Sequence, residues 1–250
     1  MKHYLTTLLT VLITLSASAQ VGEHRSELAA GINGGLLMSS VGFVPKVPQD
    51  QHIGATAGIT LRYTSEKYFN TICAIVGEVN LAQGGWKESI LDKTDQPVIN
   101  SLTGLPEEYS RTINYVQVPV LARLGWGRER QGIQAFFQAG PQVGYMLSEK
   151  TTMNFSADMR NRSARASQVA EQYSKPVEHH FDYGITAGAG VELSLRRIGH
   201  FIVEGRYYYG LGDLYGNSKR DYFGRSNLSN IVVKASYLFD LKKTDNNTIK

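Results

Sequence analysis

The sequence predicts an all-β protein: an eight-stranded antiparallel up-and-down transmembrane β-barrel with short periplasmic turns and long extracellular loops. Three observations predict this fold class. Runs of alternating apolar and polar residues recur along the chain, the segments between them alternate between short and long, and aromatic residues gather at the ends of the runs. Tyr and Gly are abundant and Pro is scarce, as is typical of strands joined by turns.

The N-terminus has the pattern of a signal peptide. A positively charged start is followed by an apolar stretch, Tyr4 to Leu15, and by a small-x-small site that ends at Ala19. About a dozen apolar residues are too few to span ~30 Å of hydrocarbon as a helix. We therefore expect a signal peptide over residues 1–19 cleaved after Ala19, an outer-membrane barrel domain over 20–240, and a polar C-terminal tail over 241–250.

Eight alternating runs account for the strands. Each has about the length that a tilted strand needs to cross a bilayer, and eight strands close a small barrel. No segment after the signal holds about 20 consecutive apolar residues, so no transmembrane helix is expected. The strands are expected near Leu28–Met38, Ile53–Tyr63, Thr71–Leu81, Ile113–Trp126, Gln134–Leu147, Tyr183–Leu195, Phe201–Leu211 and Ile231–Phe239.

The connections between these runs alternate in length without exception. A transmembrane barrel has tight turns on the periplasmic side and long loops outside the cell, whereas a soluble sandwich has no reason to sort its loops this way. The short connections are residues 64–70, 127–133 and 196–200, and the long ones are 39–52, 82–112, 148–182 and 212–230.

The two faces of the strands differ in composition. Between Asp182 and Leu195, for example, one face is apolar and the other combines Gly, Thr, Ser and Glu. A soluble, lipocalin-like barrel would carry the charged face outside, whereas a transmembrane barrel would carry it inside. Charges inside a narrow lumen need partners, because an unpaired ion is costly away from bulk water. The expected lumen charge network comprises Arg62, Glu78, Arg123, Glu192, Glu204, Arg206 and Lys234.

Aromatic residues at the strand ends favour the membrane arrangement. Phe137 to Tyr145 and Phe201 to Tyr209 are each eight residues apart, which corresponds to roughly 20 Å of membrane depth for a tilted strand. The apolar face is therefore expected to contact lipid. The expected aromatic girdles comprise Tyr63, Trp126, Phe137, Phe201 and Phe239 at the short-turn end, and Tyr145, Tyr183 and Tyr209 at the long-loop end.

Four stretches resemble a known family: YVQVPVLARLGWG (Tyr115–Gly127), FFQAGPQVGYML (Phe136–Leu147), FDYGITAGAGVEL (Phe181–Leu193) and FIVEGRYYYGLGDL (Phe201–Leu214). They are similar to the PorT-like outer-membrane β-barrel proteins of the Bacteroidetes. The resemblance implies an eight-stranded barrel in the outer membrane and no catalytic residues. The family's namesake is associated with secretion of exported proteases through the type IX system. This chain departs from many outer-membrane barrels because a polar tail follows Phe239.

Other residue constellations indicate no enzyme, cofactor or metal. His179 and His180 point opposite ways in an extended segment and cannot easily bind one ion. His52 and His200 fall at strand edges, so a Ser-His-acid arrangement is not expected from strand positions. The glycines between Gly184 and Gly190 lie inside a strand and open no helix, so they are expected to give room to bulky lumen neighbours.

The long connection before Phe181 contains a short predicted helix, Ser163 to Gln172. Arg160, Arg162 and Arg165 precede or begin it. These arginines would pair with lipopolysaccharide phosphates if they faced the membrane; a solvated loop without a ligand is the favoured alternative.

The sequence thus predicts a monomeric, non-catalytic outer-membrane barrel with an envelope-structural or protein-secretion accessory role. A narrow passive pore and a loop-mediated binding or adhesion protein are the alternatives, and a lipid hydrolase at the rim is disfavoured. The expected partners are outer-membrane lipid, lipopolysaccharide and secretion machinery. Nucleic acid is not expected, because a net charge of +4 is too weak for its footprint.

Overall fold

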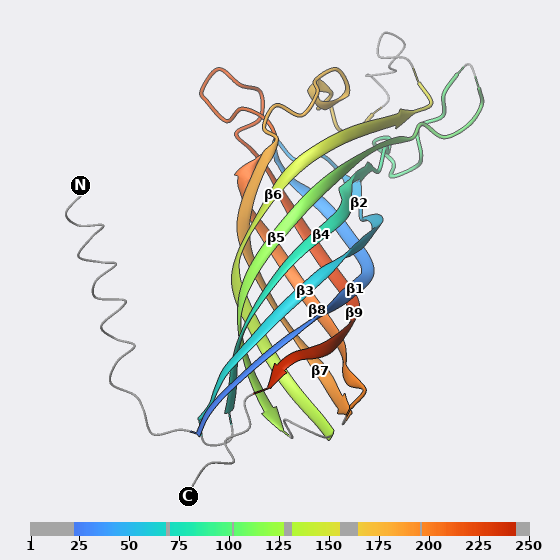
Figure 1. Ribbon diagram of the computed structural model, residues 1–250. Helices are drawn as coiled ribbons and strands as arrows, with labels where there is room; N and C mark the ends of the chain where they lie inside the picture. Colours follow the sequence, from blue (N-terminus) through green and yellow to red (C-terminus); the bar gives the residue numbers. More distant parts are fainter. Residues whose placement is uncertain are drawn as a thin grey trace, which may run out of the picture.

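One antiparallel sheet closes on itself into a barrel (Figure 1). The computed structural model describes residues 23–68, 71–101, 103–127, 132–155, 165–195 and 197–243. The expected signal peptide, Arg160 and Arg162, and the last residues of the tail lie outside these ranges. The long strands are β1 (Glu23–Val44), β3 (His52–Tyr68), β4 (Thr71–Glu88), β5 (Tyr109–Gly127), β6 (Gly132–Met153), β7 (Phe181–Leu195), β8 (Gly199–Asp213) and β9 (Arg225–Lys243).

Each long strand pairs with its neighbours in the chain, and β1 pairs with β9 to close the barrel. The fold is therefore the eight-stranded up-and-down barrel that the sequence predicts. An additional strand of two residues, β2 (Gln49–Asp50), pairs with the end of β4. The strands β1, β4, β5, β6 and β9 run beyond their predicted bounds at the long-loop end of the barrel, because segments outside a membrane lose the apolar alternation on which the prediction depends.

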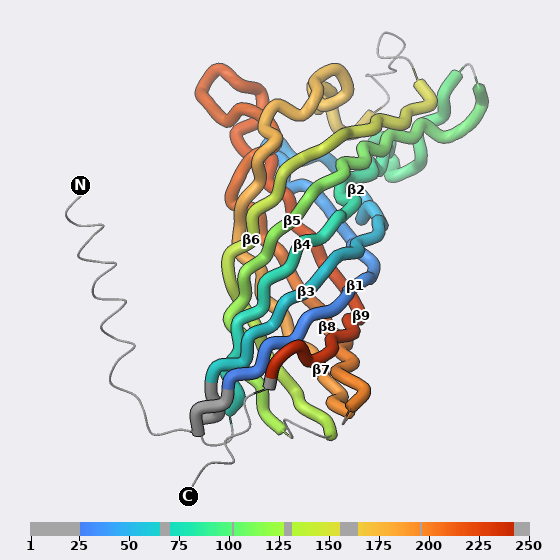
Figure 2. The backbone as a smooth tube through the Cα atoms, in the orientation of Figure 1, coloured from blue at the N-terminus to red at the C-terminus, as the bar shows by residue number. Residues whose placement is uncertain are grey.

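The short connections, the start of β1 and the end of β9 lie at one end of the barrel, and the long connections lie at the other (Figures 1 and 2). The alternation read from the sequence is therefore correct. The helix predicted for Ser163–Gln172 is wrong. The described residues 165–170 are not helical, and only a three-residue 3-10 turn, η2 (Glu171–Tyr173), follows them. This segment packs on the strand ends, and tertiary contacts override its local helix propensity.

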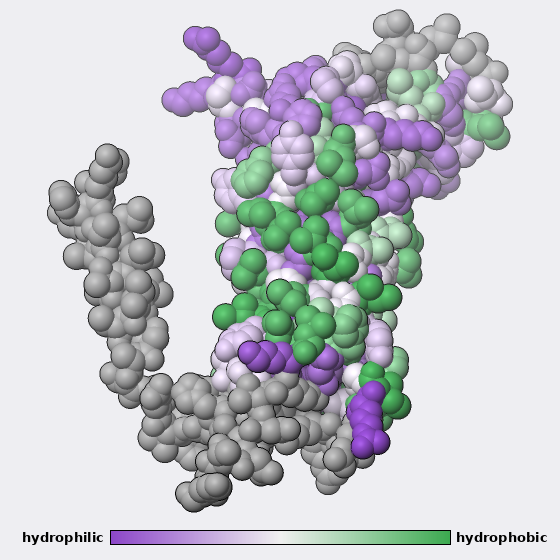
Figure 3. Space-filling view, in the orientation of Figure 1, coloured by the Kyte–Doolittle hydropathy of each residue, from purple (hydrophilic) through white to green (hydrophobic). Residues whose placement is uncertain are grey.

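The outer face of the strands forms an apolar band below the polar loops (Figure 3). Val203 and Ile185 on this face are 61% and 56% exposed, which a protein in water would not repeat around its whole circumference. Among the described residues, no helix is long and apolar enough to cross a membrane. All the predicted girdle residues are exposed on the outside of the barrel: Tyr63, Trp126, Phe137, Tyr145, Tyr183, Phe201, Tyr209 and Phe239.

The interior is divided into a polar lumen and an apolar outer end. Charged and amide side chains occupy the inward positions of the strands through most of the lumen. At the long-loop end, the interior is instead a cluster of apolar and aromatic side chains from the strand ends and the loops. These two regions are the places where a functional site could lie.

Candidate functional site

A neutral set of four charges fills the middle of the lumen; we call it the central cluster (Glu78, Glu204, Arg206 and Lys234). Arg206 donates two hydrogen bonds to Glu78, at 2.9 and 2.7 Å, and lies 2.7 Å from Glu204. Lys234 Nζ lies 2.6 Å from Glu78 and 3.2 Å from Glu204. Every charge has an opposite partner, which the dry interior requires.

The strand register creates the central cluster. Glu204 on β8 stands directly opposite Lys234 on β9, and Arg206 follows two residues later on the same face. Glu78 reaches them from β4 on another side of the barrel. Gln138 of β6 donates to Glu204 at 2.5 Å. The lumen is therefore crossed by side chains from four strands, as expected for a barrel whose interior is just wide enough to be filled.

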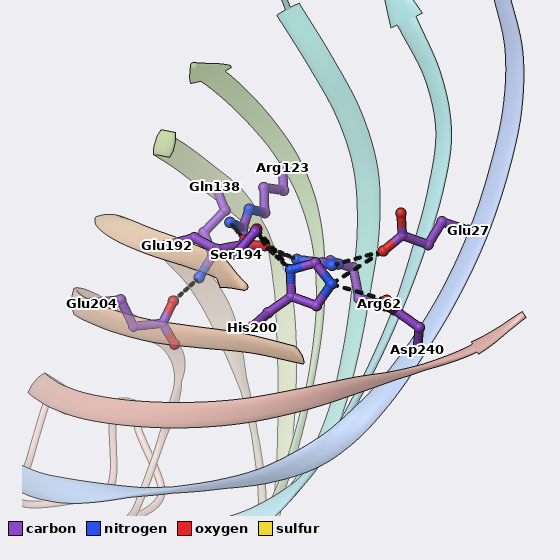
Figure 4. A network of polar contacts seen from close by, with 9 residues as sticks. All are labelled: Glu27, Arg62, Arg123, Gln138, Glu192, Ser194, His200, Glu204 and Asp240. Carbon is purple, nitrogen blue, oxygen red and sulfur yellow. Dashed lines mark hydrogen bonds and ion pairs between the residues drawn. The ribbon is translucent and has the colours of Figure 1, made fainter. Parts of the chain in front are cut away.

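A second group, the periplasmic cluster (Glu27, Arg62, Arg123, Glu192, His200 and Asp240), lies near the short-turn end (Figure 4). Arg62 donates to both oxygens of Glu192, at 2.7 and 2.8 Å. Arg123 donates to Glu192 as well and stacks over Phe136, with 3.5 Å between the guanidinium carbon and the ring centroid. Glu192 is thus the shared ion-pair partner of two buried guanidinium groups that come from separate strands.

His200 completes the periplasmic cluster. Its Nδ1 lies 2.7 Å from Glu192 Oε1 and 2.9 Å from Ser194 Oγ, and its Nε2 faces Glu27 and Asp240. The expectation that strand positions cannot assemble a Ser-His-acid arrangement is wrong, because Ser194, His200 and Asp240 form a hydrogen-bonded chain. Ser194 is fully buried, and Glu192 occupies the same imidazole nitrogen. This geometry gives a substrate no access to the hydroxyl.

Glycines on β7 make room for these side chains, as the sequence predicts. Gly188 and Gly190 face the lumen between β6 and β8. A Cβ atom on Gly188 would lie 2.7 Å from Arg206 Cγ, and one on Gly190 would lie 2.6 Å from the Phe136 ring. Such distances are well inside van der Waals contact, so the lumen is filled because these positions carry no side chain.

An apolar cap closes the outer end of the lumen. Its core includes Phe43, Trp86 and Phe223, from three separate parts of the chain; the Phe43 ring lies 5.3 Å from that of Trp86 and 5.0 Å from that of Phe223. Aromatic pairs at this spacing add to the free energy of burial. The outer loops therefore pack against the strand ends and share one hydrophobic core with them.

Arg111 on β5 ties two loops to this cap. Its guanidinium donates to the backbone oxygens of Gln172 and Lys175, at 2.9 and 2.7 Å, and to the Tyr215 hydroxyl at 2.9 Å. It also lies 5.3 Å from the centre of the Trp86 ring, a distance at which a cation is attracted to the ring face. One buried side chain thus fixes the β6–β7 and β8–β9 loops.

A second polar group in the cap surrounds Glu88, the last residue of β4. Tyr173 donates to one carboxyl oxygen of Glu88 at 2.5 Å, and Gln172 donates to the other at 3.0 Å. Arg165 is buried and pairs with Glu107, at 2.5 Å. Arg165 is therefore part of the cap's interior and does not face lipid phosphates.

The comparison with protein families decides the identity of this barrel. Residues 18–216 match the family model described as the outer membrane protein beta-barrel domain. The chain belongs to this family. An outer-membrane β-barrel protein places its apolar band in the bacterial outer membrane, with the long loops outside the cell. A comparison with curated proteins found no match.

Three solved structures share a distant likeness with this outer-membrane barrel. The attachment invasion locus protein Ail of Yersinia pestis is 12% identical, with 87% of this chain and 99% of that chain covered and a TM-score of 0.34. Neisserial surface protein A is 8% identical, with 84% of this chain and 95% of that chain covered and a TM-score of 0.40. The outer membrane protein OprG of Pseudomonas aeruginosa is 11% identical, with 87% of this chain and 97% of that chain covered and a TM-score of 0.37. These likenesses are too distant to transfer a function.

In this outer-membrane barrel, the residues of the predicted lumen network separate into two groups. Glu78, Glu204, Arg206 and Lys234 lie together, whereas Arg62, Arg123 and Glu192 lie nearer the short turns. Sequence reasoning missed Glu27, His200 and Asp240, which adjoin the ends of the expected strands. The side chains of His179 and His180 point to different neighbours, as expected. His179 lies against the Asp213 backbone oxygen, and the ring of His180 lies against Tyr145.

Burial of Glu88 makes the cap sensitive to pH. Glu88 lies beyond the outer girdle, and desolvation raises the pKa of its carboxyl despite the hydrogen bonds from Tyr173 and Gln172. A raised folded-state pKa means that the folded cap binds more protons than the unfolded chain, so stability falls as pH rises above the ordinary value of 4.5. We expect Glu88→Gln to flatten this dependence.

The measurement is thermal unfolding followed by the fluorescence of Trp86 between pH 4 and pH 8, in a Trp126→Phe background. Trp86 is fully buried in the cap, whereas Trp126 faces the membrane. An unchanged pH dependence in Glu88→Gln would show that another group titrates in the cap.

Proposed function

We propose that this outer-membrane barrel is a non-catalytic, non-conducting protein that supports the cell envelope or assists protein secretion from the cell surface. The observation that carries the proposal is the filled interior. The central and periplasmic clusters cross the lumen, and the apolar cap covers its outer end. A solute would have to break buried ion pairs at two levels, which costs several kcal/mol for each uncompensated charge.

The same features argue against the two other roles considered. A passive pore needs a continuous water path, and side chains from four strands meet across the lumen at Glu78 and Glu204. A hydrolase needs a nucleophile that a substrate can reach, and Ser194 is fully buried. The role is therefore assigned to surfaces of the protein and not to its interior.

Planar-bilayer recording tests the non-conducting part of the proposal. We expect the purified protein to show no steady open conductance. The matched variant is Arg111→Ala, which loosens the cap and leaves both lumen clusters intact. This variant should also show no steady conductance, because the central and periplasmic clusters close the lumen without the cap. Steady conductance from the wild type would contradict the proposal.

Loop-mediated binding is a second candidate, favoured by apolar residues on the outer loops. Ile99 and Leu105, between β4 and β5, are 51% and 61% exposed above the apolar band. The surrounding cap is packed, so these side chains are presented on a rigid support. A protein partner at the cell surface, such as a secretion component, would bury them. Crosslinking in cells with wild type and an Ile99→Ser/Leu105→Ser variant tests this; equal crosslinking would argue against a partner there.

The PorT-like resemblance supports an origin in the Bacteroidetes and a link to secretion, and the N-terminal pattern supports export with cleavage after Ala19. Outer-membrane lipid and lipopolysaccharide are the expected neighbours of the apolar band. The closed β1–β9 seam leaves none of the eight long strands with a free edge in the described part of the chain, which supports a monomer.

A further inference from the structure

Two carboxylates and one imidazole nitrogen converge at the periplasmic mouth of the barrel (Figure 4). His200 Nε2 lies 3.2 Å from Glu27 Oε1 and 2.9 Å from Asp240 Oδ1, and the three ligand atoms all lie within 4.8 Å of one another. We propose that Glu27, His200 and Asp240 bind a divalent transition-metal ion of the zinc class.

The spacing suits such an ion. Zinc binds nitrogen and oxygen ligands at about 2.0–2.2 Å in a tetrahedron, which places neighbouring ligand atoms about 3.3 Å apart. The two distances at His200 Nε2 are close to this value, and the two carboxylate oxygens lie within 4.8 Å of each other, so side-chain rotations would bring the three atoms around one ion. Imidazole with carboxylates is a ligand set for zinc-like ions, whereas magnesium and calcium prefer oxygen ligands alone.

The other side of the imidazole provides an independent observation. Glu192 Oε1 lies 2.7 Å from Nδ1, and Arg62 and Arg123 hold Glu192 in turn. Metal-binding histidines commonly donate their second N–H to a carboxylate in this way, which orients the ring. An imidazole with one N–H that donates to Glu192 presents a lone pair on Nε2. In that tautomer the lone pair faces two carboxylates, and a metal ion between them would take the place of the proton that otherwise joins Nε2 to Asp240.

The site is accessible from the periplasm. The Asp240 and Glu27 side chains are 24% and 12% exposed, whereas the His200 side chain is 4% exposed. An ion therefore reaches the carboxylates without passing the filled lumen. Water from the periplasm, on the exposed side of Asp240, would supply the fourth ligand.

The three ligands come from strands on both sides of the barrel's closing seam. Glu27 belongs to β1, His200 to β8 and Asp240 to β9. The β1–β9 register shifts next to Asp240, between Leu28 and Ala29, and such bulges re-aim neighbouring side chains. A bound ion would join the first strand to the last two and stabilise the closed barrel.

Calorimetry on the purified, folded protein in detergent tests the proposal. The protein is stripped with a chelator, freed of it and titrated with zinc chloride. We expect one strong site, and a higher temperature for the loss of the folded band on a gel when zinc is present. Asp240→Asn should still fold, because Asp240 is partly exposed. Removing a group that only orients a metal ligand typically lowers metal affinity by about 10- to 100-fold. Because Asp240 is itself a proposed ligand, we expect the zinc affinity of Asp240→Asn to fall by more than this.

A loop variant is the matched control, since His179 and His180 are histidines outside the proposed site, each of which could bind added zinc weakly on its own. His179→Gln/His180→Gln should bind zinc like the wild type, and His200→Gln should bind it at least as weakly as Asp240→Asn. Cobalt should give the visible absorption of a tetrahedral complex in the wild type and lose it in Asp240→Asn. Equal zinc affinity in Asp240→Asn and the wild type, or a loss confined to the loop variant, would overturn the proposal.

Discussion

Replacing Glu192 with glutamine is expected to lower the free energy of unfolding by about 3–5 kcal/mol. Glu192 is almost fully buried and is the partner of two guanidinium groups, those of Arg62 and Arg123. Glutamine keeps the shape but removes the charge, so the arginines lose their counter-ion in a place that water cannot readily enter. The penalty comes from these uncompensated charges and not from the loss of attraction alone.

Urea unfolding of the refolded barrel, in the presence of a chelator, measures this change. Glu178→Gln is the control, since Glu178 is partly exposed on an outer loop and pairs with Lys175 at 3.5 Å. Its removal should cost less than about 1 kcal/mol. Adding Arg123→Gln to Glu192→Gln should cost less than the sum of the two single changes, since the charges are coupled. Strict additivity would contradict the role assigned to Glu192.

Sequence reasoning places the lumen charges well for a physical reason. Successive side chains of a strand point to opposite faces of the sheet. When the apolar neighbours of an ionisable residue contact lipid, the ionisable side chain must therefore point into the lumen. Arg62 and Glu204 both stand in this position and both are buried. Which charges pair with which could not be predicted, because partners such as Glu78 and Arg206 come from strands that are not neighbours and no local signal relates them.

Sequence reasoning missed three residues at the periplasmic mouth because it placed the strand boundaries too far inside the strands. The expected strands begin at Leu28 and Phe201 and end at Phe239, whereas Glu27, His200 and Asp240 each lie one position further. The aromatic girdle set those boundaries, but the inward face continues past it as ordered strand.

The cap was missed for a different reason. The Trp86 and Tyr215 side chains are fully buried, yet they belong to segments whose sequences read as a polar strand end and a loop. The hydrophobic periodicity that reveals a strand is absent there. Only the closing of the barrel brings these distant aromatic residues together, and Arg111 then links them.

A valine at Gly190 is expected to prevent stable folding, with a cost at or above the upper end of the about 1–3 kcal/mol typical of overpacking. A Cβ atom there would lie 2.5 Å from the Val203 backbone oxygen, 2.6 Å from the Phe136 ring and 2.7 Å from Glu204 Cβ. The backbone contact cannot be relieved by a rotamer change, and the Phe136 ring is itself held under Arg123. The measurement is the fraction of protein that migrates as the folded band after refolding.

Gly205 provides the matched control on the adjacent strand. It is paired with Ala189 on β7, but a Cβ atom there would meet nothing within 4 Å. Valine favours strands and would contact lipid, so Gly205→Val should fold as well as the wild type or better. The pair of variants tests the assignment of the two faces directly. If Gly205→Val were the damaging change and Gly190→Val the harmless one, the polar face would be outside, and the protein would not be a membrane barrel.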